Sequence, residues 1–182
     1  AEPDLSDQQA AILCHRFNFD LHNALVDTTS LATRVMLLQS GRRTLQRLAK
    51  SDPGNAAWQR ALSVSLTRLG DLTTAQGNLS EAARFFGECH VVLQRLAESH
   101  PGNAARQFDL GISNERLGNL AQARGDLDSA RRFQTARYEI IRRLAESDPG
   151  IAEWQRDLSV SLIKLGDVAT SQGNLNEAAR LF

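Results

Sequence analysis

A repeat of 48 residues constrains the fold of this chain more than any other feature. The segment Ser51–Phe86 returns as Ser147–Phe182 with 26 of 36 positions identical, and a looser copy begins at Ser99. The Pro-Gly pairs of the three copies lie 48 residues apart. A fixed period of roughly 20–50 residues is typical of a solenoid, in which each unit buries its apolar face against its neighbours.

Each unit is predicted to be a pair of helices. The first helix of the Ser51 copy has an apolar stripe at helical spacing, formed by Leu62, Leu66, Leu69 and Leu72. Gly77-Asn78 ends that helix, because both residue types tolerate the left-handed conformation of a helix terminus. The second helix has its own stripe, formed by Leu79, Ala82, Phe86, Cys89, Leu93 and Leu96. We expect Asp52 to cap the start of the unit and Pro53 to open its first helix.

Residues 1–50 are interpreted as a degenerate copy of the unit. Ser6 to Gln9 has the form of a capping box and predicts a helix that ends near Val26. The next helix has leucines that match the second-helix stripe when shifted by 48 residues, namely Leu31, Leu38, Leu45 and Leu48. The predicted organisation is a single solenoid of four segments: 1–50, 51–98, 99–146 and the partial repeat 147–182.

The glycine and alanine pattern resembles that of the tetratricopeptide (TPR) family. The signature elements are Leu69-Gly70, Gly77, Leu79, Ala82 and Phe86, and their offsets recur in the later copies. The small residues allow two helices to approach closely. The repeat departs from the family in length, since a TPR has about 34 residues; the excess amounts to about two turns on each helix. The resemblance implies an all-α, right-handed α-solenoid of antiparallel helix hairpins, a TPR-like superhelix.

Composition and motifs argue against several functions. Lys and Arg number 21 and Asp and Glu also 21, so no net charge attracts nucleic acid or a membrane surface. No apolar run reaches the about 20 residues of a membrane-spanning helix. The two cysteines fit reduced thiols in the cytoplasm rather than a disulfide framework. His15, His22 and Cys14 share the first predicted helix, but their spacing favours a structural role over metal binding. We expect no enzyme activity and no cofactor.

Arginine pairs recur on the second helices, at Arg42-Arg43, Arg131-Arg132 and Arg142-Arg143. Acidic residues accompany them, which predicts a solvated outer face with ion pairs one helical turn apart. Binding of nucleic acid through these arginines is the minor alternative, because the reader residues that RNA-binding helical repeats need do not recur here.

Two pairs of residues stand out at positions that the repeat predicts to be interior. Trp58 and Trp154 occupy the same repeat position, which favours a packing role. Asn114 and Gln134 stand where the neighbouring repeats have Leu and Phe. An unpaired buried amide costs about 1–3 kcal/mol, so we expect these two side chains to pair with each other. The alternative is that they mark a polar notch.

In the TPR family, first helices line a concave groove that takes a peptide or a partner helix. The resemblance places twelve residues on this surface: Arg60, Val64, Thr67, Asp71, Phe108, Ile112, Glu115, Asn119, Arg156, Val160, Ile163 and Asp167. Of the positions that clamp a terminal carboxylate in one TPR subclass, only Asn119 fits, so no carboxylate clamp is expected. The mixture of apolar and acidic residues suits an amphipathic or basic segment. We expect Phe108, Ile112 and Glu115 to contribute most.

The sequence therefore predicts a protein–protein interaction scaffold that is one part of a longer chain. The alternative is a regulatory or sensor arm of a larger signalling enzyme, a protease or kinase, outside these residues. Where the last repeat stops, the first helix should show part of an apolar face (Leu158, Leu162 and Leu165) that other repeats cover. Self-association of that end would give a two-fold homodimer.

Overall fold

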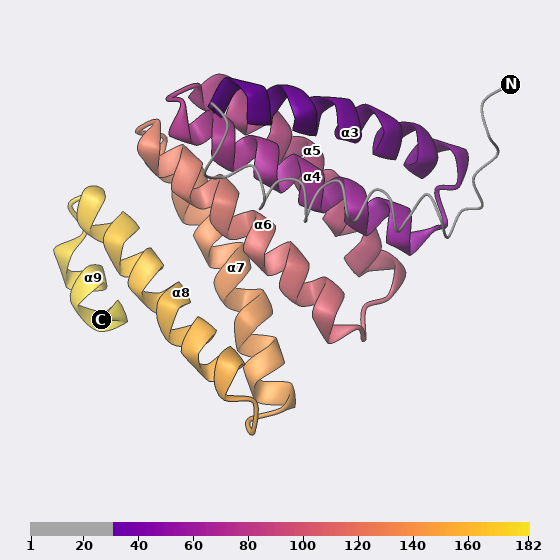
Figure 1. The fold of residues 1–182 in the computed structure, drawn as a ribbon. Coiled ribbons are helices and arrows are strands. Elements are labelled where there is room, and N and C mark those ends of the chain that lie inside the picture. The colour runs from indigo at the N-terminus through magenta and orange to yellow at the C-terminus, as the bar shows by residue number, and fades with distance from the viewer. Residues whose placement is uncertain (1–30) are drawn as a thin grey trace, which may run out of the picture. The chain divides into compact units, whose positions relative to one another are not determined.

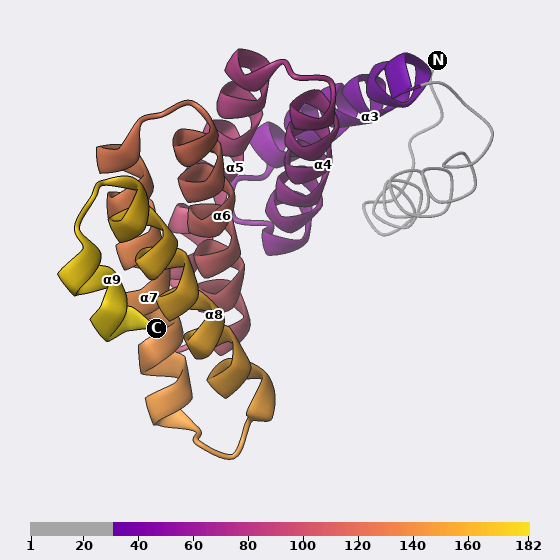
Figure 2. The same cartoon turned by 90° about the vertical axis from the view of Figure 1, so that its left-hand side faces the viewer.

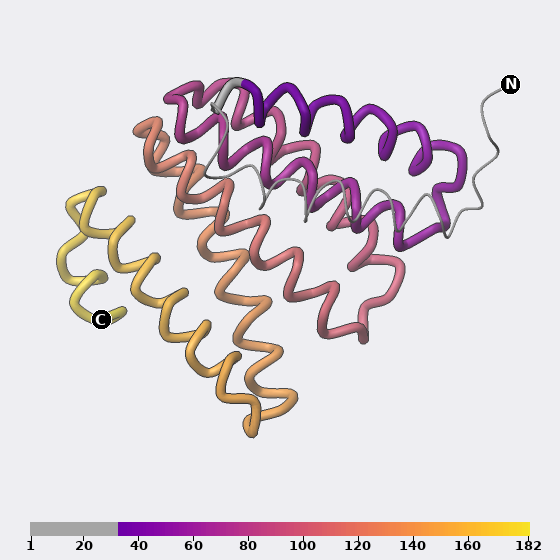
Figure 3. Tube along the Cα trace, in the orientation of Figure 1, coloured from indigo at the N-terminus to yellow at the C-terminus, as the bar shows by residue number. Residues whose placement is uncertain are grey.

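The computed structural model describes residues 31–182, which form seven α-helices and no strand. The predicted helix between Ser6 and Val26 lies outside the described residues. The helices and their bounds are α3 (Leu31–Ser51), α4 (Ala56–Ala75), α5 (Leu79–Ser99), α6 (Ala104–Ala123), α7 (Leu127–Ser147), α8 (Ala152–Ser171) and α9 (Leu175–Leu181). Short turns join them (Figure 1; traced as a tube in Figure 3). The all-α helical-repeat fold is thus confirmed for this part of the chain.

The chain divides into two compact units, Ala1–Val92 and Leu93–Phe182, with the boundary inside α5. In the first unit α3 packs against α4. In the second unit α7 packs against both α6 and α8, and α9 folds back on α8 (Figure 2). The right-handed superhelical twist stays a prediction, because it depends on the placement of the two units relative to each other.

Turns end the first helices where the glycines predicted them. Gly77, Gly125 and Gly173 have φ values of 76°, 76° and 79°, a conformation that favours glycine. The start of each first helix differs from the prediction. Asn55, not Asp52, is the N-cap of α4, and its side chain accepts hydrogen bonds from the backbone N–H groups of Ala57 and Trp58. Asp52 and Pro53 instead belong to the preceding turn, which the Asn55 backbone N–H closes by donating to the Asp52 carbonyl oxygen at 3.2 Å.

The predicted leucine stripe of α4 is buried, with Leu66 1% exposed and Leu69 fully buried. Trp58 is also buried, which confirms its packing role. Its counterpart Trp154 packs against the cluster of Ile140, Ile141 and Leu144 in α7. Arg106, at the same position in α6, instead extends toward the Leu96 carbonyl oxygen and His100.

A recurring glutamine ties each first helix to the helix before it. Gln59 Nε2 donates to the carbonyl oxygen of Ala49 at 2.9 Å, and Gln107 Nε2 donates to that of Ala97 at 3.2 Å. Gln155 Nε2 makes the third bond of this kind, to Ala145 at 3.3 Å. These bonds satisfy carbonyl groups near helix C-termini that have no partner within the helix. They fix how the chain turns from one hairpin into the next.

Candidate partner-binding site

The four predicted groove residues of α4, in the first unit, differ in how exposed their side chains are. Arg60 is exposed, while Val64 and Asp71 are half-buried. Thr67 is partly engaged inside the hairpin, because its Oγ1 donates to the Ser63 carbonyl oxygen at 3.0 Å and lies 3.3 Å from Cys89 Sγ. This helix therefore contributes one exposed cation and one small apolar side chain to the face.

The α6 part, in the second unit, is largely occupied by internal contacts. Phe108 is half-buried and packs against the cluster that Ile140, Ile141 and Leu144 form on α7. Ile112 is half-buried as well. An aromatic ring packed against its own hairpin contributes less free surface to a partner than the sequence suggested.

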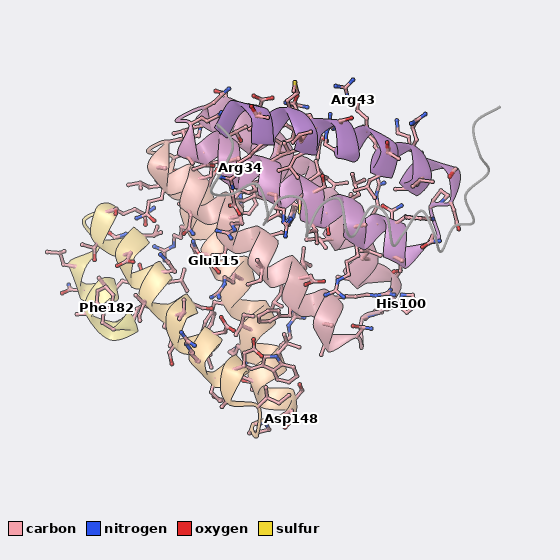
Figure 4. All side chains as sticks on the ribbon, in the orientation of Figure 1. Arg34, Arg43, His100, Glu115, Asp148 and Phe182 are labelled. Atoms are coloured by element: carbon pink, nitrogen blue, oxygen red, sulfur yellow. The ribbon has the colours of Figure 1, made fainter. Side chains whose placement is uncertain are left out.

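Glu115 forms an ion pair with Arg137 of α7, in which Arg137 Nε lies 2.9 Å from Glu115 Oε2. The Arg137 side chain is only 1% exposed and the Glu115 side chain 22%. Figure 4 labels Glu115 in the middle of α6. A buried guanidinium requires such partners, because an unpaired charge away from water is strongly unfavourable.

Arg137 also reaches α8. Its second terminal nitrogen lies 2.9 Å from Asp157 Oδ1, and the first donates to the Ser161 hydroxyl group and to the Asp157 carbonyl oxygen. One guanidinium thus joins three helices. The sequence analysis did not identify this network. The sequence did contain an indication of the network: Arg137 occupies the repeat position at which the previous repeat has Cys89, a residue of the apolar stripe.

Asn119 and the two interior amides are arranged differently from the prediction. Gln134 Nε2 donates to Asn119 Oδ1 at 3.1 Å, and Asn114 Nδ2 donates to the Leu110 carbonyl oxygen one turn back on its own helix. Asn114 and Gln134 do not pair with each other, so that expectation is wrong. The physical reason is proximity: the groove residue Asn119 offers Gln134 an acceptor, while the helix backbone satisfies Asn114.

The α8 part of the face is the most open in the second unit. Arg156 and Ile163 are exposed, and Val160 and Asp167 are half-buried. Among the residues that the structure describes, neither the Arg156 guanidinium nor the Asp167 carboxylate forms an ion pair. This helix can therefore offer a partner apolar surface flanked by one free charge of each sign.

Of the six paired arginines, Arg142 forms the ion pairs predicted one helical turn apart, while Arg42 and Arg131 pair with carboxylates of other helices, Glu88 and Glu177. Arg142 is bound by Glu139 and Glu146, one turn away on either side, and their hydrogen bonds raise the pKa of Arg142 above its usual value. Arg131 donates to Glu177 Oε2 at 2.8 Å, which connects α7 to α9. Carboxylates thus already neutralise much of the positive charge on these helices.

Within residues 31–182, no group of three or more His, Cys, Asp or Glu side chains could hold a metal ion. His15, His22 and Cys14 lie outside the described residues. His90 on α5 is half-buried, and this burial lowers the pKa of its imidazole. None of the helices that the structure describes has the length and apolar character needed to cross a membrane.

Comparison with known proteins supports the helical fold. No protein-family model matches the sequence, and no curated protein matches it. A similar solved structure is the crystal structure of BtubC (BKLC) from P. vanneervenii, with a TM-score of 0.65 and 18% sequence identity. The match covers 98% of this chain but only 63% of that one, so this chain spans less than two thirds of its structural relative. At this identity the likeness shows a shared helical fold.

Proposed function

We propose that the chain is a protein–protein interaction scaffold of TPR-like helix hairpins, which binds a peptide or helical segment of a partner on the face of its first helices. The observation that carries the proposal is the open face of α8, where Arg156 is exposed and Val160 and Asp167 are half-buried beside it. Apolar surface rimmed by charges of both signs suits an amphipathic segment.

We propose that the side chains that contribute most to binding lie on α8, and not on α6 as the sequence suggested. Phe108 packs on the α7 cluster, and Glu115 is held by Arg137, so neither side chain is free for a partner. A residue that dominates binding must lose water and gain contacts in the complex. Arg156 and Val160 fulfil that condition better than Phe108 and Glu115.

The proposal includes the TPR relationship and a cytoplasmic location. Support for the first is the Gly-to-aromatic packing between the helices of a hairpin, at Gly70 with Phe86 and at Gly166 with Phe182. Support for the second comes from the sequence, whose two cysteines are too few for a disulfide framework.

A peptide-display selection on the immobilised chain tests the function, with selected peptides then measured by calorimetry. Arg156→Glu reverses an exposed charge and Val160→Asp places a charge in the apolar centre of the face. We expect each to weaken binding about tenfold or more, while Arg43→Glu, at an exposed arginine of α3, leaves it unchanged. Selection of no binding peptide would contradict the function. Peptides that bind all three variants equally would contradict the location.

A further inference from the structure

A cavity of about 290 Å³ lies at the end of the α6–α7 hairpin where α6 begins and α7 ends. Pro101 and Gly102 of the preceding turn and Ala104 of α6 line one side of it, and Ile140 and Leu144 of α7 line the other. Ala104 also packs on the cluster that contains Ile140 and Leu144, so the base of the cavity is apolar. The lining residues all belong to the second unit, between positions 101 and 147, and described helices precede and follow them in the chain.

The size of the cavity suits one large side chain rather than a whole small molecule. Pockets that enclose a drug-sized ligand measure about 300–1,000 Å³, so this cavity lies at the lower limit of that range. The residues that dominate protein–protein binding are commonly anchors of this kind, in which one aromatic or aliphatic side chain fills a pocket. An anchor here would cover the exposed part of Ala104, which is half-buried.

An arginine without an ion pair stands at the open edge of the cavity. Arg143 lines the cavity and is exposed. Its Nε donates to the Glu139 carbonyl oxygen at 3.1 Å, and its terminal nitrogens have no carboxylate partner among the residues that the structure describes. None of the described residues that line the cavity is acidic. A guanidinium beside an apolar pocket matches a carboxylate that neighbours an inserted apolar side chain.

The same arginine recurs in α3, α5 and α7, as Arg47, Arg95 and Arg143, and all three side chains are exposed. Another exposed position of this stretch differs between the copies, since Gln94 of α5 corresponds to Arg142 of α7. A cation near a helix C-terminus is favourable, but that effect needs only a positive charge and leaves the guanidinium nitrogens available. The recurring arginine can therefore also bind an external carboxylate.

The turn beside the cavity lacks a carboxylate that its counterparts have. In the α7–α8 turn, Asp148 Oδ1 accepts a hydrogen bond from the Gly150 backbone N–H at 3.2 Å. The α3–α4 turn has Asp52 at the same repeat position, whereas the turn at the cavity has His100 (Figure 4 labels His100 and Asp148). A carboxylate that approaches Arg143 thus avoids the repulsion that an aspartate in this turn would cause.

We propose that this cavity binds an exposed segment of a partner protein in which an aromatic or long aliphatic side chain is flanked by acidic residues. The apolar side chain enters the cavity between α6 and α7, and a flanking carboxylate binds the Arg143 guanidinium. An apolar anchor surrounded by charge is the common pattern of a protein–protein contact. The surface is additional to the groove of the proposed function, because none of the twelve predicted groove residues lines the cavity.

The probe is the peptide acetyl-Glu-Phe-Glu-amide, titrated into the full chain labelled with ¹⁵N and followed by two-dimensional NMR. We expect saturable shifts of the Gly102 backbone amide and the Gln107 side-chain amide, since both residues line the cavity. Acetyl-Lys-Phe-Lys-amide lacks the carboxylates and acetyl-Glu-Ala-Glu-amide lacks the anchor, so each should bind about fivefold more weakly or worse. No saturable shift up to about 10 mM of the first peptide would overturn the proposal. Equally strong binding of either comparison peptide would overturn it too.

Charge variants locate the carboxylate contact. Arg143→Glu should weaken binding of the first peptide about fivefold or more, and because Arg143 is exposed the variant should fold, which circular dichroism verifies. Arg124→Glu, at an exposed position at the other end of the same hairpin, should change binding less than about twofold. His100→Asp restores the residue of the neighbouring turns and should weaken binding about twofold or more.

Equal binding by the parent chain and Arg143→Glu would overturn the proposal. Light scattering tests the other occupant, a second copy of the chain. A dimer of the parent chain that Arg143→Glu dissociates would assign the cavity to that second copy and would overturn the proposal as well.

Discussion

Arg137 and Asp157 form an ion pair between α7 and α8, with the guanidinium nitrogen 2.9 Å from the carboxylate oxygen. The arginine side chain is 1% exposed and the aspartate side chain 21%, so the positive charge is buried while the negative charge retains contact with water. Glu115 supplies a second carboxylate from α6. Because a buried charge depends on its partners, this contact makes the packing of α6, α7 and α8 sensitive to single substitutions.

The ion pair predicts a coupling that a double-mutant cycle can measure. Glu115→Ala and Asp157→Ala should each lower the free energy of unfolding by about 1–3 kcal/mol, because each leaves the buried Arg137 with one partner fewer. Arg137→Met removes the charge itself, and in that background Asp157→Ala should cost less by about 0.5–3 kcal/mol. Urea unfolding followed by circular dichroism gives all the values.

Glu153→Ala serves as the control, since Glu153 is exposed on the same helix. It should shift stability by less than about 0.5 kcal/mol in either background. Additive effects of Arg137→Met and Asp157→Ala would show that the contact contributes nothing specific.

Much of the fold could be predicted from the sequence because it depends on local periodicity. The leucine stripe of α4 and the turn at Gly77 follow from the chemistry of one helix and its end. The Arg137 network could not be predicted in this way. Its partners lie 22 and 20 residues away on two other helices, and only packing brings them together.

The candidate site shows the same limit. The repeat register places Phe108 and Glu115 on the groove face, but register alone does not determine whether a side chain already contacts its own hairpin, and both of these do. The hydrogen bonds of the recurring glutamines, in contrast, could have been predicted from the sequence. Gln59 and its counterparts recur in every described repeat, and a polar residue that recurs with the period at a helix start indicates a repeated backbone contact.

A pH dependence is expected from His90. Burial lowers the pKa of His90 in the folded state, so the unfolded chain binds the proton more readily. Stability should therefore be unaffected above the ordinary histidine pKa of about 6.5 and should fall as the pH drops below it. Comparing urea unfolding of the parent and His90→Gln at pH 8 and pH 5 isolates this effect, since the carboxylates are the same in both. A stability difference that does not change with pH would contradict it.

The helix glycines should respond to alanine in opposite ways. Gly70→Ala should lower stability by about 1–3 kcal/mol, because its Cβ would overlap the buried Phe86 ring. Gly118→Ala should cost less, since the new Cβ would meet the end of the Gln134 side chain, which is more easily displaced. Gly87→Ala is the matched control inside α5, with no atom of residues 31–182 within 4 Å of the new Cβ, and should stabilise by about 0.5–1 kcal/mol through helix propensity. Thermal melts would rank the three; a destabilising Gly87→Ala would contradict the steric explanation.

Replacing Gln134 with phenylalanine should stabilise the middle repeat. Gln134 is fully buried, and its Oε1 has no hydrogen-bond partner among the residues that the structure describes. The neighbouring repeats place Phe86 and Phe182 at this position against a glycine, as Gln134 lies against Gly118. Gln134→Phe removes the unpaired acceptor and buries apolar surface, while the half-buried Asn119 can bond to water instead. We expect a gain of about 1 kcal/mol in urea unfolding.

The reciprocal change, Phe86→Gln, introduces a buried amide into the first unit and should cost about 3 kcal/mol or more, since Phe86 is 4% exposed. The two substitutions exchange the same residue types at equivalent repeat positions, so differences in helix propensity largely cancel between them. A loss of stability in Gln134→Phe, with Phe86→Gln behaving as expected, would mean that the 3.1 Å hydrogen bond from Gln134 to Asn119 stabilises the hairpin more than an aromatic ring can. In that case the polar interior of α6 and α7 would be a stabilising feature of this repeat rather than a packing defect.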